Sequence, residues 1–138
     1  MGEARDLAEG FFTAFGKGDL DAALGCFADD CVSVTPGGAL DKAAHEAMSR
    51  GFMAAFPDAR MEVTRVVEAG DEAFFAGRFA GTHTGDMVTP NGTIPASGNA
   101  LDLPFADYFR VSGGRIVAHE TYWDQMTLLG QLGALPPG

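Results

Sequence analysis

The residue best placed to do chemistry in this sequence is Asp107, an acid within an apolar row of a predicted strand. Side chains alternate between the two faces of a strand. In the stretch 100–112 one face therefore carries Leu103, Phe105, Asp107, Phe109 and Val111. Burial among apolar side chains disfavours the charged form of a carboxyl group, which suits a general acid or base working near neutral pH. The alternatives are a core Asp that accepts hydrogen bonds from the backbone or a Tyr, and an Asp that a bulge turns outward.

Two histidines lie on predicted strands, and a third lies on a predicted helix. His83 ends an aromatic row on the strand predicted over 72–84. The direction of His119 on the strand predicted over 115–123 stays open, because neither face of that strand is cleanly apolar and a bulge could reverse it. His45 falls on the polar side of its helix and is predicted to be solvated. A lone strand histidine is more often structural than catalytic, so the pattern alone leaves these roles open.

Asp124 stands between the last predicted strand and a helical pattern, QMTLLGQLG, that starts at residue 125. An Asp in this position can cap the first free backbone N–H groups of a helix, and the local pattern favours that role. The other hypothesis is a catalytic acid or base. The two roles conflict, because a carboxylate that accepts two backbone N–H bonds is held ionised and makes a poor base.

The elements that must position these residues follow from the periodicity of apolar side chains. Helical spacing predicts helices over 3–15 and 20–27 and from Asp41 to Pro57, with Asp19 and Asp41 as capping candidates. Alternation and short turns predict mostly antiparallel strands over 31–35, 60–69, 72–84, 100–112 and 115–123. The Gly- and Pro-rich stretch 85–99 is predicted to be a lid or rim. We therefore predict one α+β domain over residues 1–138, with helices first and a curved antiparallel sheet after them.

Composition limits the partners of the chain. Nine Lys and Arg residues against 19 Asp and Glu residues give a net charge of −10, so neither nucleic acid nor an anionic membrane is an expected partner. No secretory signal or membrane-length apolar run is present, which predicts a cytoplasmic protein. Cys26 and Cys31 are expected to be free thiols, and no motif for zinc, phosphate or dinucleotide binding appears.

Several local patterns resemble those of a known family. They are GDLDAALGCFADDCV at 18–32, FPD at 56–58, GTHTG at 81–85, PASG at 95–98, ADYFRVSGGRIVAHE at 106–120 and DQMTLLGQLG at 124–133. Their order along the chain is similar to that of the SnoaL-like polyketide cyclase (ester cyclase) family, within the nuclear transport factor 2-like superfamily. The resemblance covers about residues 5 to 135. The insert DMVTPNGTI between the third and fourth patterns is longer than is typical of the family.

The resemblance implies a cone-shaped fold and a homodimer formed through the outer face of the sheet. It also implies an intramolecular aldol ring closure on an aromatic polyketide ester, without a metal or cofactor. In the family that the chain resembles, an aspartate in the cone serves as acid and base; by position it matches Asp124, with Asp107 and His83 implied as neighbours in the site. The residues implied for the pocket wall are Phe11, Phe15, Phe79, Phe105, His119, Tyr122 and Trp123.

Two other functions remain open at this stage. An epoxide hydrolase or isomerase of the same fold would use Asp107 and Asp124 around a water molecule, although no arginine lies beside Asp107 on its face. A binding protein without turnover would hold an apolar or aromatic small molecule in the cone, an idea favoured by the 11 Phe residues and the sparse polar set.

Overall fold

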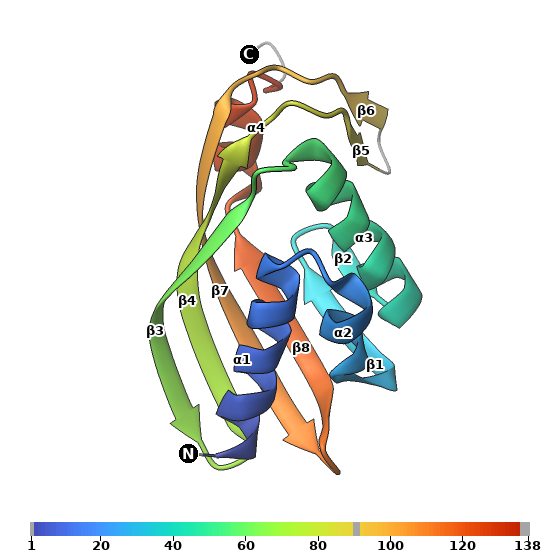
Figure 1. Ribbon diagram of the computed structural model, residues 1–138, viewed down its shortest axis with the longest axis vertical. Helices are drawn as coiled ribbons and strands as arrows, with labels where there is room; N and C mark the ends of the chain where they lie inside the picture. The colour runs from blue at the N-terminus through green and yellow to red at the C-terminus, as the bar shows by residue number, and fades with distance from the viewer. Residues whose placement is uncertain (1, 90–91, 136–138) are drawn as a thin grey trace.

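The computed structural model describes residues 2–89 and 92–135 (Figure 1). Its helices are α1 (Glu3–Gly16), α2 (Leu20–Gly25), α3 (Lys42–Ala55) and α4 (Gln125–Gln131). Its strands are β1 (Phe27–Thr35), β2 (Gly38–Leu40), β3 (Arg60–Ala69), β4 (Glu72–Thr82), β5 (Met87–Thr89), β6 (Gly92–Ile94), β7 (Ala100–Ser112) and β8 (Arg115–Trp123). Within these described ranges, no helix is long and apolar enough to span a membrane.

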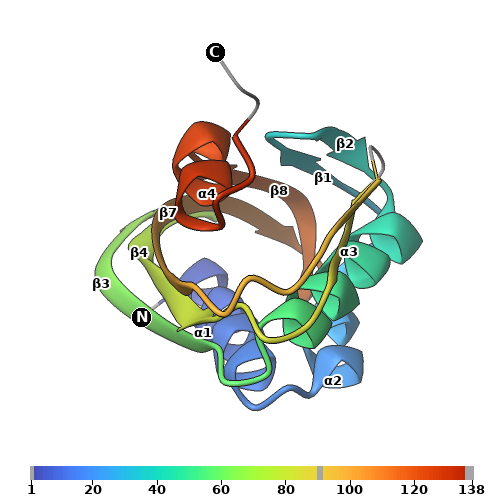
Figure 2. The same cartoon turned by 90° about the horizontal axis from the view of Figure 1, so that it is seen from above.

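The main sheet has the strand order β2-β1-β8-β7-β4-β3. Strand β1 runs parallel to β8, and the other neighbours in this sheet are antiparallel. Seen from above, the sheet curves around α1, while α3 runs along its open side (Figure 2). The predicted α+β class, with N-terminal helices packed on a curved and mostly antiparallel sheet, is therefore confirmed.

Side-chain caps fix the starts of two helices. Asp19 accepts a hydrogen bond from the backbone N–H of Ala22 at 3.1 Å, and Asp41 accepts one from Ala44 at 2.8 Å. Each satisfies a backbone donor that has no partner within its helix. Both predicted caps are confirmed, and α3 starts at the position that brings one of its faces onto the sheet.

The second helix ends earlier than predicted. It stops at Gly25, and Phe27 begins β1 instead of ending the helix. The cause is pairing with β8: Phe27 lies opposite Ile116, whose N–H donates to the carbonyl of Cys26 at 2.8 Å. Long-range pairing of this kind overrides a short helical pattern, and it extends the inner face of β1 towards the site.

The curvature of the sheet depends on a close approach at Gly77. A register irregularity in β3 falls between Val63 and Arg65, opposite this glycine on β4. A Cβ atom at position 77 would lie 2.1 Å from the carbonyl oxygen of Glu62 and 3.1 Å from the ring of Phe105. Only glycine fits at this bend, which sets the wall of the cone beside the site.

The irregular segment 85–99 leaves β4, reaches the end of α3 and returns to β7 (Figure 2). Its strands β5 and β6 pair with each other as a separate two-stranded sheet. The N–H of Gly85 donates to the carbonyl of Ala55 at 3.1 Å, and a Cβ atom on Gly85 would lie 2.0 Å from the carbonyl oxygen of Ala54. The segment is thus fitted closely against α3.

Candidate active site

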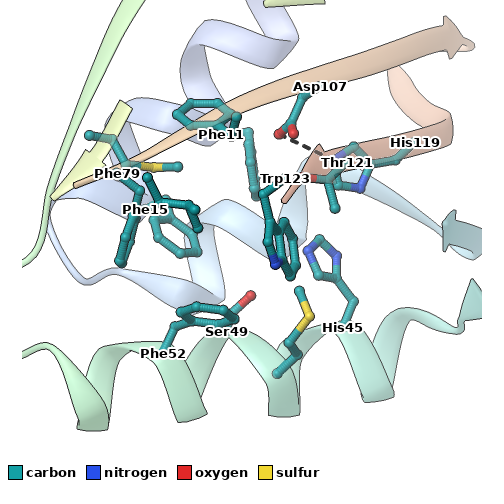
Figure 3. A pocket seen from close by; sticks show the side chains of 14 residues that line it. Phe11, Phe15, His45, Ser49, Phe52, Phe79, Asp107, His119, Thr121 and Trp123 are labelled. Atoms are coloured by element: carbon teal, nitrogen blue, oxygen red, sulfur yellow. Dashed lines mark hydrogen bonds and ion pairs between the residues drawn. The ribbon is translucent and has the colours of Figure 1, made fainter. Parts of the chain in front are cut away.

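A cavity of about 70 Å³ lies between α1, α3 and the inner face of the sheet. Its wall is mostly aromatic and aliphatic, with a small polar group on one side (Figure 3). A volume of this size holds a few water molecules, so the site is hollow before any ligand enters. The lining residues are Phe11, Phe15, His45, Met48, Ser49, Phe52, Met61, Phe79, Leu103, Phe105, Asp107, His119, Thr121 and Trp123.

The polar side of the cavity is built around Asp107 and His119 on the neighbouring strands β7 and β8. Oδ2 of Asp107 lies 3.4 Å from Nε2 of His119, and the two residues are only 4% and 2% exposed (Figure 3). The His119 ring stacks on Phe109, with the ring centroids 4.9 Å apart. The pairing of β8 with β7 skips Val117 of β8, opposite Arg110 and Val111, so that Ile116 and His119 both face inward. The direction that the sequence left open is therefore inward.

The hydrogen-bonded group continues from His119 to two further buried residues. Oγ of Ser33, on β1, lies 2.8 Å from Nδ1 of His119 and 3.3 Å from Nδ1 of His45, on α3. Ser33 is 1% exposed and His45 is 3% exposed. Burial, and secondly the nearby His119, lowers the pKa of His45 to about 4, so its ring is neutral at pH 7.

The prediction that His45 is solvated is therefore corrected. His45, Ser49 and Phe52 share one face of α3 at helical spacing, and that face lies against the sheet. Two of these three residues are polar, so an apolar pattern could not identify the face. The available signal was the spacing of His45 and Ser49, four residues apart and in line with Phe52.

Two polar atoms at the cavity have no hydrogen-bond partner among the described residues. They are Oδ1 of Asp107 and Oγ of Ser49, both fully buried. An unpaired buried polar atom costs on the order of 1 to 3 kcal/mol, so such atoms are rare in a core that serves packing alone. Unpaired polar atoms beside a hollow are typical of a functional site rather than of a packed core.

His83 does not belong to this group, contrary to expectation. It is fully buried at the base of segment 85–99 and does not line the cavity. Its Nδ1 accepts a hydrogen bond from the backbone N–H of Ser97 at 3.2 Å and lies 2.9 Å from the Ser97 hydroxyl. The aromatic row that predicted a pocket histidine continues past the cavity. His83 instead holds segment 85–99 through its hydrogen bonds to Ser97.

Asp124 also lies outside the cavity wall, and its predicted place in the site is corrected. Its Oδ1 accepts a hydrogen bond from the N–H of Met126 at 3.0 Å, and its Oδ2 accepts one from the Thr127 hydroxyl at 2.9 Å. The bonds from Thr127, together with the one from Met126, lower the pKa of this exposed carboxyl. The N-cap interpretation of the local sequence pattern describes this arrangement.

Tyr122 and Trp123 point to opposite sides of β8. Trp123 lines the cavity and packs edge-on against Phe52, with ring centroids 5.7 Å apart. Tyr122 is 49% exposed on the outer face of the sheet and donates a hydrogen bond to Glu120, so its expected place in the pocket is corrected. Strand alternation allows only one of two consecutive residues to face the cone.

The four phenylalanines predicted for the pocket wall all lie in it. Phe11 and Phe15 of α1, Phe79 of β4 and Phe105 of β7 all line the cavity. Segment 85–99, expected to be a lid or rim, contributes no described residue to the lining. Among the described residues, no group of three or more His, Cys, Asp or Glu side chains could hold a metal ion.

Comparison with solved structures shows what this chain is similar to. IdmH from Streptomyces antibioticus, a candidate polyketide cyclase, is 28% identical, with a TM-score of 0.78; the match covers 94% of this chain and 98% of that one. TsrD from Streptomyces laurentii is 26% identical over 96% of each chain, with a TM-score of 0.81. AclR from Streptomyces galilaeus, a candidate hydroxylase, is 22% identical over 98% of this chain and 87% of that one, with a TM-score of 0.84; at this identity it shows the shared fold alone.

Curated protein sequences give no significant match. A family model, in contrast, matches most of the chain. The model of the SnoaL-like domain aligns with residues 8–119, a range that contains Ser33, His45, Asp107 and His119. The curved α+β cone and the structural neighbours named as polyketide cyclases agree with that match. This chain therefore belongs to the SnoaL-like domain family.

Proposed function

We propose that this protein is a cofactor-independent, polyketide cyclase-like enzyme that uses Asp107 for acid/base chemistry on an apolar carbonyl compound. The reaction would be an aldol-type ring closure or related enol chemistry. The observation that carries the proposal is the buried Asp107 carboxylate, paired with His119 at the wall of an aromatic cavity and left with one oxygen unpartnered. The family and its cyclase-named neighbours support a cyclase-like role.

The chemistry begins with loss of a proton from a carbon next to a carbonyl group. The C–H bond breaks, the proton is stored on the Asp107 carboxylate as a neutral acid, and the substrate becomes an enolate. The enolate carbon then bonds to a second carbonyl carbon, whose oxygen becomes an alkoxide and takes the proton back. Asp107 thus returns to its carboxylate form at the end of each turnover and can act as a base again.

The aromatic wall would hold the substrate and shape the reaction. Phe11, Phe15, Phe79 and Phe105 offer ring faces to an aromatic compound, and such contacts are favourable at offset or edge geometries. A water-poor cavity also strengthens the interactions of a developing charge with fixed polar groups. A delocalised substrate that spreads the enolate charge over its own ring would fit this site.

A second candidate function is a binding protein without turnover, which the same aromatic lining favours. The hydrolytic alternative built on Asp107 and Asp124 around one water is not proposed, because Asp124 caps α4 outside the cavity wall. We also propose that two chains associate through the outer face of the sheet. Support comes from the exposed apolar side chains Val32, Val34, Val67, Phe74 and Tyr122, which we call the outer-face patch.

The test of catalysis is exchange of an α-proton for deuterium in D2O, followed by NMR with 2-tetralone and a panel of aryl β-keto esters as probes. We expect the wild-type protein to accelerate exchange and Asp107→Asn to lower the rate by about 100-fold or more, while the fold is retained. Asp124→Asn, which keeps a capping side chain, is the matched control and should exchange near the wild-type rate. Thermal stabilisation by the probes without any exchange would instead favour the binding protein.

A further inference from the structure

The hydrogen-bonded group at the cavity is longer than an Asp–His pair requires. Four side chains from four elements form one continuous row: Asp107 on β7, His119 on β8, Ser33 on β1 and His45 on α3. The chain of contacts measures 3.4 Å, 2.8 Å and 3.3 Å between successive polar atoms. Burial of a second histidine at the end of this row costs desolvation free energy. Packing of the core alone would not require it.

Because Ser33 has a single hydroxyl proton, the donor and the acceptor of each hydrogen bond in the row are fixed. Ser33 lies between two Nδ1 atoms and can donate to only one of them. When ionised Asp107 accepts from Nε2–H of neutral His119, Nδ1 of His119 is bare and takes the Ser33 proton. Ser33 must then accept from Nδ1–H of His45, which leaves Nε2 of His45 without a proton. The lowered pKa of His45, about 4, agrees with a neutral ring.

The two ends of the row differ in access to the cavity. Oδ1 of Asp107 is fully buried without a partner, so a substrate cannot reach it in this arrangement. Nε2 of His45 has no hydrogen-bond partner among the described residues either, but it is not one of the fully buried atoms, and His45 lines the cavity. Figure 3 shows the His45 ring rising from α3 beside Trp123. The substrate can therefore meet the row at His45.

We propose that His45 is the substrate-facing acid/base residue of the site, and that Ser33 and His119 connect its Nε2 to the carboxylate of Asp107. This assignment rests on the proposed function and names the group that touches the substrate. It makes Ser33 and His119 positioning residues that also carry protons. Asp107 becomes the distant charge that drives the reaction.

The proton transfers balance along the row. The substrate C–H bond breaks and its proton joins Nε2 of His45; Nδ1–H of His45 passes to Ser33, the Ser33 proton to Nδ1 of His119, and Nε2–H of His119 to Oδ2 of Asp107. The enolate then forms its C–C bond, and the same transfers run backwards to deliver the His45 Nε2 proton to the alkoxide. No imidazolium remains buried, which removes the main obstacle to a base with a pKa about 4.

The first test needs no substrate and uses the wild-type chain. In protein labelled with 15N-histidine at pH 7, we expect His45 as the Nδ1–H form and His119 as the Nε2–H form, assigned through His45→Gln and His119→Gln. The 15N shifts of the two ring nitrogens distinguish the forms. A wild-type His45 that carries its proton on Nε2 would overturn the proposal.

The second test uses the α-proton exchange of 2-tetralone. We expect His45→Gln and Ser33→Ala each to lower the rate by about 100-fold, and the double variant His45→Gln with Asp107→Asn to lose little more than either single one, because the residues act as a unit. Cys31→Ala is the matched control: Cys31 is also buried on β1 but does not line the cavity. Exchange lost in Asp107→Asn but kept in folded His45→Gln and Ser33→Ala would overturn this inference and leave the proposed function standing. Absence of exchange by the wild type would overturn the proposed function.

Discussion

Asp107 raises the central question at the scale of single residues, namely what keeps a carboxylate in an aromatic wall. Burial of an ionised carboxyl without compensation costs far more than a domain can tolerate. The compensation visible here is one contact to His119 and the polar row beyond it. A purely structural buried Asp would normally have hydrogen bonds to both carboxylate oxygens, more than Asp107 has here. Under the proposed function, this lack of partners keeps the residue available to take a proton.

The pH dependence of stability follows from His45. Its pKa is about 4 in the folded protein and 6.5 when unperturbed, so between these values the unfolded chain binds more protons. The free energy of unfolding therefore falls as the pH drops from 7 to 5, by about 2 kcal/mol from this residue. The groups that face the ring are His119, directly, and Asp107 through it.

The measurement is urea unfolding at pH 7 and pH 5, for the wild type and His45→Gln. The variant is expected to be less stable at pH 7, because it disturbs the row, but to lose about 2 kcal/mol less on acidification. An equal loss for both proteins would contradict a buried, neutral His45.

At the scale of elements, α4 depends on its first residue. Asp124 satisfies one backbone donor and the Thr127 hydroxyl at the start of a helix of only seven residues. We expect Asp124→Ala to lower the melting temperature by a few degrees, since loss of an N-cap destabilises a helix, and Asp124→Asn to lower it much less. Exchange activity per folded molecule should be unchanged in both. Loss of activity in folded Asp124→Asn would restore the catalytic hypothesis for this residue.

Elements also explain how far the site could be predicted from the sequence. Alternation along β7 was enough to place Phe105 and Asp107 inside, and helix periodicity placed Phe11 and Phe15. Alternation could not place His119, because its direction depends on the irregularity at Val117 of β8, which is a property of strand pairing. It also failed for His45, because the inner face of α3 is partly polar. The prediction for His83 failed for a third reason: β4 ends at Thr82, so His83 lies past the strand and past the cavity that Phe79 lines.

At the scale of the whole molecule, the two faces of the sheet differ in character. The inner face carries the cavity, whereas the outer-face patch exposes Phe74 at 51% and Val67 at 65% to solvent. Association through the patch would cover these side chains without blocking the cavity. A twofold dimer brings the same patch of both chains together, so one substitution changes the interface twice.

Sedimentation equilibrium tests the association. We expect the wild-type protein to have the mass of two chains, and Phe74→Glu to shift it towards one, because two buried carboxylates would oppose each other in the interface. Lys17→Glu, which also introduces a carboxylate but lies at the end of α1, away from the patch, should leave the mass unchanged. A monomeric wild type would refute the dimer.

The central claim is that a ligand in the cavity gives up a proton to the hydrogen-bonded row that ends in Asp107. The most direct measurement is the ultraviolet absorption of 2-naphthol bound at pH 7, because its oxyanion resembles the enolate of 2-tetralone. Phenol-type hydroxyls stay protonated in water at this pH. The account predicts the naphtholate spectrum when the wild-type protein binds the probe and the neutral spectrum with Asp107→Asn. Neutral 2-naphthol bound to the wild type, or equal ionisation in both proteins, would contradict it.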